Sequence, residues 1–177
     1  MACWEPDAPF SHPFDYRLVQ NTFVSMFSSP AVLREATDWL AEHGYHVVTL
    51  NAATWAGTDD MHRKLAAALD FPSYYGRNLN AFSDCLSDVA TGDYGLPPGA
   101  TGLVLVLLGI EVFAASHRGT AQALLNAFAV QARNAALIGS RMMCLVQSNN
   151  PKLRFEPVGA TQVWWNDAEM FGANRRP

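Results

Sequence analysis

Two aspartates, Asp84 and Asp88, are the residues of this chain whose type and spacing most directly suggest a chemical role. They stand four positions apart in a segment of helical periodicity, so the two carboxylates lie one above the other on one helix face. Like charges at this spacing destabilise an isolated helix by about 0.2–0.5 kcal/mol. Two explanations remain open: a solvated side of a surface helix, or a surface that binds a cationic partner.

The helix that would carry this pair is predicted within residues 71–89. At about 100° per residue, four apolar side chains share one stripe that faces a core. They are Leu79, Phe82, Leu86 and Val89. The opposite side is polar and consists of Arg77, Asn80, Asp84, Ser87 and Asp88. Such a helix packs one side on the protein and presents the other to solvent or to a partner.

The residues around the start of this helix have structural explanations of their own. Of Tyr74 and Tyr75, we expect Tyr75 to pack as a hydrophobic staple at the start of the helix. Gly76 suits a tight turn, and Asn78 suits capping or bracing of the backbone. Cys85 borders the buried stripe and is interpreted as a small, inert core residue.

The rest of the chain offers no catalytic or metal-binding pattern of comparable strength. The five histidines lack the spacing of metal ligands such as HxxxH. Cys144 lies in an apolar segment without a recognisable histidine base, and Asp167 and Glu169 lack a partner that would define a cleft. We therefore expect no enzymatic activity, no cofactor and no metal; a hydrolase that uses Cys144 or the Asp167–Glu169 pair is the remaining alternative.

Length and composition point to one globular domain. The 177 residues are 50% apolar and 16% charged, which is enough to bury a core and too apolar for a disordered chain. The net charge is −4 and there is no run of lysines or arginines. This argues against nucleic acid as a direct ligand, because phosphate contacts need concentrated positive charge, but it is compatible with a basic protein partner.

The cysteines and the N-terminal residues predict an intracellular location. Three cysteines without a CxxC pair suit a reducing cytoplasm better than a disulfide framework. The first residues are interrupted by prolines and carry Glu5 and Asp7, so they lack the basic and apolar regions of a signal peptide. The longest apolar run, residues 103–108, is too short to cross a bilayer. We expect a cytoplasmic protein that does not bind membranes.

Strand and helix patterns alternate along the chain, which favours an α/β fold with a mainly parallel sheet. Apolar or β-branched runs predict strands at residues 16–27, 45–50, 103–108 and 142–148. Periodic segments predict helices from Pro30 to Gly44, from residue 58 to Pro72, over 79–89 and from Thr120 to Leu137. Residues 109–119 are expected to be irregular or partly helical, and residues 91–102 form a loop rich in glycine and proline.

The two ends of the chain are less regular. Residues 1–15 are interpreted as an irregular lead-in and the C-terminal GANRRP as a frayed end. Residues 153–158 and 161–166 are expected to form a terminal hairpin or an added edge strand. Within a strand, one of Trp164 and Trp165 faces outward, either as an interface anchor or packed under the N-terminal segment.

The segment FPSYYGRNLNAFSDCLSD, residues 71–88, resembles the signature of the barstar family of intracellular inhibitors of guanylate-preferring secreted ribonucleases such as barnase. The shared pattern is an apolar residue with Pro, then Tyr-Tyr-Gly, Asn-Leu and Asp-Cys-Leu. The order of strands and helices agrees over residues 45–148, which implies a barstar-like core within a single domain of residues 1–177. Residues 1–44 would add an N-terminal strand–helix unit, and residues 149–177 a C-terminal strand or hairpin.

The family inhibits by laying this helix and its flanking loop over the active site of the nuclease. The resemblance implies that Asp84 mimics a phosphate in a basic secreted or toxin ribonuclease, which would make the chain a bacterial immunity protein. It implies a protein partner and no direct contact with nucleic acid. The partner-binding residues that it implies are Tyr74, Gly76, Asn78, Asn80, Asp84, Ser87 and Asp88.

Several positions depart from the family pattern. Arg77 replaces a glutamate, Asn80 replaces an acidic contact residue and Ser83 replaces a tryptophan. Val130 or Gln131 stands where a contributing glutamate is expected. These changes favour a different cognate nuclease. They also leave an alternative function, a non-inhibitory interaction module that forms a homodimer or binds another protein. The oligomeric state is therefore either a monomer or a homodimer.

Overall fold

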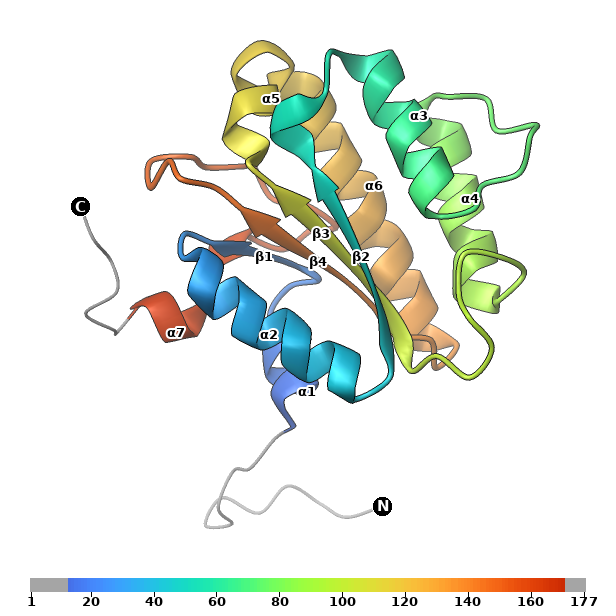
Figure 1. Cartoon of the computed structure of the whole chain (residues 1–177), viewed down its shortest axis with the longest axis horizontal. Coiled ribbons are helices and arrows are strands. Elements are labelled where there is room, and N and C mark those ends of the chain that lie inside the picture. Colours follow the sequence, from blue (N-terminus) through green and yellow to red (C-terminus); the bar gives the residue numbers. More distant parts are fainter. Residues whose placement is uncertain (1–12, 171–177) are drawn as a thin grey trace.

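Residues 13–170 are described by a computed structural model, and they form a parallel sheet with helices on both faces (Figure 1). The sheet has five strands in the order β2-β3-β4-β1-β5, and every neighbouring pair is parallel. The strands are β1 (Val24–Phe27), β2 (Tyr45–Asn51), β3 (Gly102–Leu108), β4 (Met142–Gln147) and β5 (Trp164–Trp165). The predicted α/β class with a mainly parallel sheet is confirmed.

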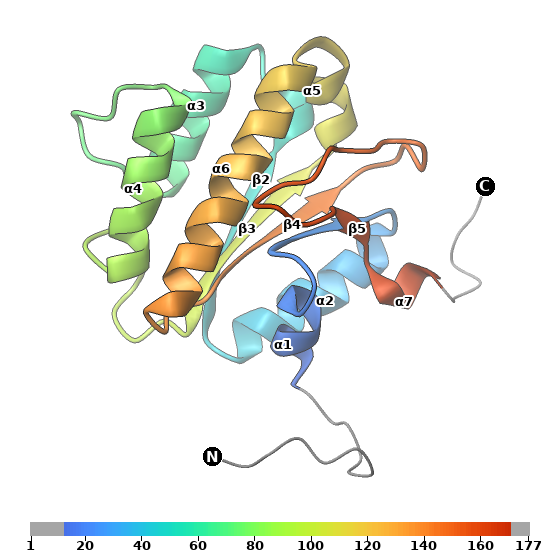
Figure 2. The same ribbon diagram turned by 180° about the vertical axis from the view of Figure 1, so that it is seen from behind.

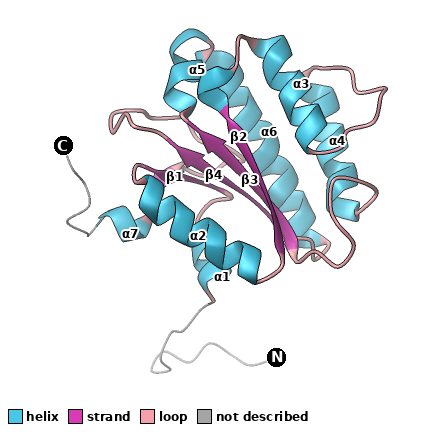
Figure 3. Ribbon diagram, viewed as in Figure 1, coloured by secondary structure: helices cyan, strands magenta, loops and turns pink. Residues whose placement is uncertain are grey.

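Helices connect and cover the strands. In chain order they are α1 (Phe14–Val19), α2 (Pro30–Glu42), the 3-10 helix η1 (Ala52–Thr54), α3 (Thr58–Ala68), α4 (Leu79–Thr91), α5 (Ile110–Ser116), α6 (Arg118–Leu137) and α7 (Asp167–Met170). Figures 1 and 2 show α2 on one face of the sheet and α3, α4 and α6 on the other, and Figure 3 shows the strands enclosed between these layers. None of the helices in the described part of the chain is long and apolar enough to span a membrane.

The side chains of β3 alternate between two cores, as its continuous apolar run predicts. The core under α4 and α6 receives Leu103, Leu105 and Leu107. The core under α2 receives Val104 and Val106. All of these side chains are at most 2% exposed. Water is therefore excluded from both faces at the centre of the sheet, which supports α6 and, packed against α6, the helix α4.

The helix predicted from Pro30 is confirmed as α2. Ser29 caps it by accepting a hydrogen bond from the N–H of Val32, and Pro30 occupies the first turn, where its missing N–H costs nothing. Gly44 follows the helix with a φ of 82°, a left-handed conformation that favours glycine and ends the helix.

The strand predicted at residues 16–27 is wrong in its first half. Residues Phe14–Val19 form α1, and only Val24–Phe27 are extended. Phe14 and Leu18 lie four residues apart, so they share one helix face; Phe14 packs edge-on against Trp39 and Leu18 is buried in the same core. This helical spacing begins before residue 16, outside the segment whose near-alternation suggested a strand.

Three other helices differ only in extent from the prediction. α5 makes most of residues 109–119 helical, and α6 begins at Arg118 rather than Thr120. α4 continues to Thr91 before Gly92 ends it with a φ of 86°. The predicted loop after α4 is correspondingly shorter.

The C-terminal segment adds an edge strand, so of the two alternatives for residues 161–166 the hairpin does not form. β5 pairs in parallel with β1, with Ser25 opposite Trp164, and the antiparallel contact of Val158 with Thr161 is an isolated bridge. Trp164 is 51% exposed and Trp165 is 8% exposed, as alternation along a strand predicts. The expectations for residues 1–12 and for GANRRP lie outside the described residues.

Polar contacts hold the segment before β5 against α6. The side chain of Gln122 donates to the carbonyl oxygen of Glu156 at 3.0 Å and accepts from its N–H at 2.9 Å. Asn126 accepts from the N–H of Gly159 at 3.0 Å. This segment is therefore packed on the same helix layer that supports α4.

Candidate protein-binding surface

α4 has a buried side that fixes its position and an exposed side that is available to a partner. Phe82, Leu86 and Val89 of the predicted stripe are 0% exposed, and Leu79 is partly buried against the same core. Cys85, beside the stripe, is 4% exposed. Figure 2 shows α4 beside α3 and α6, on the opposite side of the molecule from β5 and α7. We call the exposed side and the loop before it the α4 surface, defined by Tyr74, Gly76, Arg77, Asn78, Asn80, Asp84 and Ser87.

Asn78 holds the start of α4. Its Oδ1 accepts a hydrogen bond from the N–H of Ala81 at 2.9 Å, and its Nδ2 donates to the carbonyl oxygen of Gly76 at 3.2 Å. A Cβ added to Gly76 would lie 3.1 Å from that Nδ2, so glycine leaves room for the cap. Asn78 therefore caps the helix. Contact of Asn78 and Gly76 with a partner stays a prediction.

Tyr74 and Tyr75 have opposite environments. Tyr74 is 76% exposed, whereas Tyr75 is 8% exposed and packs edge-on against Phe71. The Tyr75 hydroxyl lies 2.5 Å from Nδ1 of His62 on α3. His62 is 1% exposed, and burial lowers its pKa against an opposing effect of the Asp59 carboxylate. Tyr75 thus joins the loop to α3, and Tyr74 remains on the α4 surface.

Asp84 provides the free carboxylate of the α4 surface. Its side chain is exposed and makes no hydrogen bond or ion pair within the part of the chain that the structure describes. Asn80 and Ser87, about one turn to either side, are also exposed. A carboxylate that is fixed on a helix and lacks an internal partner is ready to accept charge-assisted hydrogen bonds from outside.

Asp88 is not equivalent to Asp84. The hydroxyl of Tyr94 donates to Asp88 Oδ2 at 3.0 Å and lies 3.2 Å from the carbonyl oxygen of Cys85. Burial, then the side chains of Cys85 and Asp88, raise the pKa of Tyr94, so the hydroxyl keeps its proton and continues to donate. Asp88 therefore holds the loop after α4, and its contact with a partner stays a prediction.

A hydrogen bond between α4 and α6 lies beside Asp84. Gln131 Nε2 on α6 donates to Ser83 Oγ at 2.7 Å. It fixes α4 one residue before Asp84 and engages Gln131, one of two positions where the family pattern suggested a glutamate. Neither this pair nor Asp88–Tyr94 could be predicted from periodicity, since each joins segments whose mutual placement is set by tertiary packing.

Arg77 provides the positive charge of the α4 surface. Its φ of 48° places it in the left-handed region, which non-glycine residues rarely adopt. The side chain is exposed and makes no hydrogen bond or ion pair among the described residues. The candidate surface therefore carries a cation and an anion that are both unpaired.

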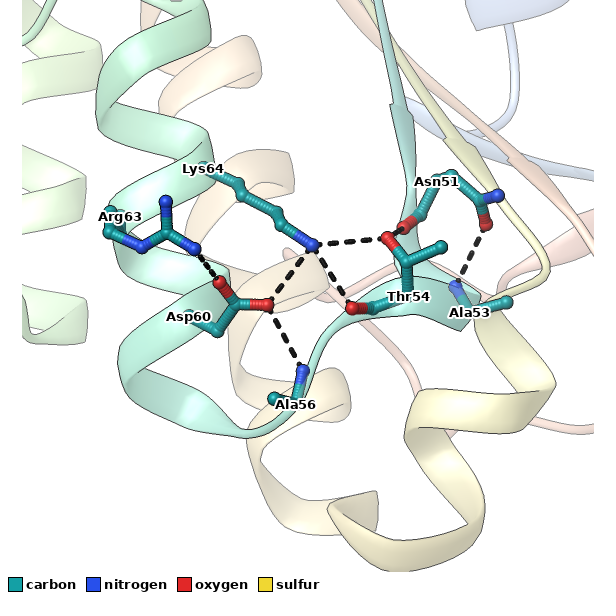
Figure 4. A network of polar contacts seen from close by, with 7 residues as sticks. All are labelled: Asn51, Ala53, Thr54, Ala56, Asp60, Arg63 and Lys64. Carbon is teal, nitrogen blue, oxygen red and sulfur yellow. Dashed lines mark hydrogen bonds and ion pairs between the residues drawn. The ribbon is translucent and has the colours of Figure 1, made fainter.

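The cations of α3 belong to a separate network (Figure 4). Asp60 forms ion pairs with Arg63 and, at 3.0 Å, with Lys64, which also donates to the carbonyl oxygen of Thr54 at 3.0 Å. The N–H of Ala56 and then the ammonium of Lys64 lower the pKa of Asp60 to about 2. Arg63 and Lys64 thus have a counter-ion of their own.

Cys144 and Glu169, which the sequence left as candidates for a hydrolase, are both buried. Cys144 is 0% exposed, and burial raises its pKa, which keeps the thiol protonated. Glu169 is 1% exposed and accepts from the N–H groups of Ser28 and Ser29 at 2.7 and 2.9 Å and from the Ser28 hydroxyl at 2.6 Å. It thus occupies the N-terminus of α2, where a carboxylate is stabilised. No group of three or more potential metal ligands occurs among the described residues.

α4 presents an exposed, unpaired carboxylate, and the loop before it presents an exposed tyrosine. Together they form a surface suited to binding another protein. A family model described as Barstar (barnase inhibitor) matches residues 45–147, which is more than half of the chain. The chain therefore belongs to the barstar family, and the resemblance first seen in residues 71–88 is confirmed.

Comparisons with individual proteins give partial likenesses. A protein of Bacillus subtilis (strain 168), named "Putative ribonuclease inhibitor YrdF", is 39% identical over 64 residues, which are 36% of this chain and 60% of that protein. The chain thus spans less than two thirds of that relative. The crystal structure of Cdc6p from Pyrobaculum aerophilum aligns with a TM-score of 0.55 at 13% identity, over 86% of this chain and 41% of that chain. At this identity the likeness concerns the fold alone.

Proposed function

We propose that this protein is a ribonuclease inhibitor that covers the active site of a basic secreted or toxin ribonuclease with the α4 surface. The observation that carries the proposal is Asp84, an exposed and unpaired carboxylate on a helix whose other side is buried. Membership of a family described as barnase inhibitors supports it.

The physical basis is mimicry of a phosphate. A ribonuclease holds the phosphates of its substrate with clustered Arg, Lys and His side chains, and a carboxylate can pair with the same groups through charge-assisted hydrogen bonds. The helix of Asp84 is already held by Ser83 and by its buried side, so little order is lost on binding. Complementary charge also speeds the encounter of the two proteins.

The proposal describes an immunity protein of a bacterial cell that makes a ribonuclease. The inhibitor would act in the cytoplasm, and it would block the active site by occupying it, without catalysis and without a cofactor. The net charge of −4 supports this assignment, because it opposes the charge of a basic nuclease.

Replacement of Asp84 by alanine tests the proposal. We expect Asp84→Ala to weaken binding to the nuclease by at least about 2 kcal/mol, roughly thirtyfold, because it removes a charge from the centre of the interface. The barstar family itself supplies the best-known example of such an aspartate, so this importance is inferred from the resemblance. Calorimetry measures the affinity. Asp38→Ala, an exposed carboxylate on α2, is the matched control, and equal affinity of Asp84→Ala and wild type for a demonstrated partner refutes the proposal.

Trp164 favours a second candidate function, the non-inhibitory interaction module. It is 51% exposed on the edge strand and, with Arg17 and Trp165, lines a cavity of about 230 Å³. An interface centred on a tryptophan depends little on ionic strength, whereas the association rate of a complex centred on Asp84 falls as salt is added. The salt dependence of association with a captured partner therefore distinguishes the two functions.

A further inference from the structure

Two opposite charges on the α4 surface lack partners within the described protein. Arg77 and Asp84 are both exposed, and neither makes a hydrogen bond or an ion pair there. Arg77 lies in the loop just before Asn78, the cap of α4, and Asp84 lies within that helix, so both belong to the α4 surface. A partner that covers the helix and the loop before it meets both charges.

The backbone around Arg77 is held at both ends. Tyr75, on one side, is buried and hydrogen-bonded to His62 of α3. Asn78, on the other side, caps α4. Arg77 itself adopts the left-handed conformation between these two fixed points. The position of its Cα relative to Asp84 is therefore set by the fold.

The other acidic side chains next to this face are engaged within the protein. Asp88 accepts from the Tyr94 hydroxyl, and Asp93 accepts a hydroxyl hydrogen bond at 3.0 Å. Asn80, between the two free charges, is neutral. Residues 77–84 thus present one cation and one anion in a fixed order.

We propose that the cognate ribonuclease carries a carboxylate beside its phosphate site, placed to pair with Arg77 while the cationic groups of that site bind Asp84. The inference rests on the proposed function and adds the chemistry of the rim of the partner's active site. A guanidinium that loses water at an interface without an acceptor weakens the complex. A carboxylate opposite it accepts two parallel hydrogen bonds instead.

The same arrangement disfavours a nuclease whose rim is uniformly basic. The resemblance implies a glutamate where this chain has Arg77, and a basic partner attracts a glutamate at that position. A partner's cation that faces Arg77 is repelled instead, because like charges brought together at an interface weaken binding. Arg77 therefore selects the partner both by attraction to an acid and by repulsion of a base, two routes to specificity that interfaces combine.

Barnase is the probe for this inference, and the full chain carries the substitutions. We expect Arg77→Glu to bind barnase at least about tenfold more tightly than wild type, and Arg77→Gln to fall between them, because glutamine only removes the repulsion. Arg34→Glu, an exposed arginine of α2, makes the same change in net charge and should alter the affinity less than about twofold. Against a secreted ribonuclease that the wild type inhibits, Arg77→Glu should instead weaken binding about tenfold.

The expected increase in barnase affinity of Arg77→Glu should also require Asp84, so the double variant with Asp84→Ala should lose that increase. The inference is overturned if Arg77→Glu binds the ribonuclease that the wild type inhibits as tightly as the wild type does, because no carboxylate of that partner then pairs with Arg77. An increase in barnase affinity no larger than that of Arg34→Glu also overturns the inference, because the change in net charge then explains it. The proposed function fails separately, when Asp84→Ala alone leaves inhibition of a demonstrated ribonuclease unchanged.

Discussion

Asp84 and Asp88 are two aspartates on successive turns of α4, but their contacts differ, and so do their roles. Tyr94 donates to Asp88 and ties the loop of residues 92–100 to the helix. Asp84 has no such contact in the described chain and keeps both oxygens available. The periodicity of residues 79–89 predicted that both carboxylates face outward. It held no information on Tyr94, whose place depends on how a loop rich in glycine and proline folds back on α4.

Tyr94→Phe should reduce the free energy of unfolding by about 1 kcal/mol, because it keeps the ring and removes the hydrogen bond to Asp88. Urea unfolding followed by circular dichroism measures the change. Tyr74→Phe is the matched control, since Tyr74 is 76% exposed, and should change the stability by less than about 0.5 kcal/mol. A loss in Tyr94→Phe no larger than in the control would show that Asp88 does not hold the loop through Tyr94.

Among the helices and loops, α3 and α4 are linked through a buried histidine–tyrosine contact. His62 of α3 meets Tyr75 just before α4, so the position of the α4 surface depends on α3. The sequence predicted that α3 starts after Gly57 and that Tyr75 packs inward. It did not indicate His62, because a histidine beside the apolar stripe of a helix is equally compatible with solvent, and its partner comes from the following loop.

Acid should destabilise the protein through His62. Burial lowers the pKa of His62 in the folded state, so below about pH 6.5 the unfolded chain binds a proton that the folded protein does not. Stability is therefore lost as the pH falls from about 6.5 toward the folded-state pKa, by at most about 1.4 kcal/mol per pH unit. Urea unfolding at a series of pH values measures this slope. His62→Gln should be less stable at neutral pH but lose less stability on acidification, and equal slopes in the two proteins would contradict the assignment.

Across the whole molecule, the N- and C-terminal segments share one sheet with the region that the family model matches. β1 lies between β4 and β5, and Glu169 holds the turn before α2. The alternation of strands and helices was enough to predict a parallel sheet. The strand order was not predictable, because Val24 pairs beside Cys144 across most of the chain and no local pattern specifies that contact.

Glu169→Gln should reduce the free energy of unfolding by about 2 kcal/mol, because a neutral amide offers one acceptor oxygen to three donors that now meet a carboxylate. Thermal and urea unfolding measure the loss. Asp167→Asn makes the same change of charge at an exposed position of α7 and should stay within about 0.5 kcal/mol of wild type. If the two variants are equally stable, Glu169 does not fasten the C-terminal segment to α2.

The central claim, that Asp84 on the α4 surface blocks a ribonuclease, is tested most directly by titrating ribonuclease activity with the protein. Cleavage of a fluorogenic RNA by a basic secreted ribonuclease should fall to background at an equimolar amount of wild type and of Asp38→Ala. Asp84→Ala should need roughly thirtyfold more protein for half inhibition under conditions where binding is reversible. Inhibition by Asp84→Ala equal to that by wild type would contradict the account.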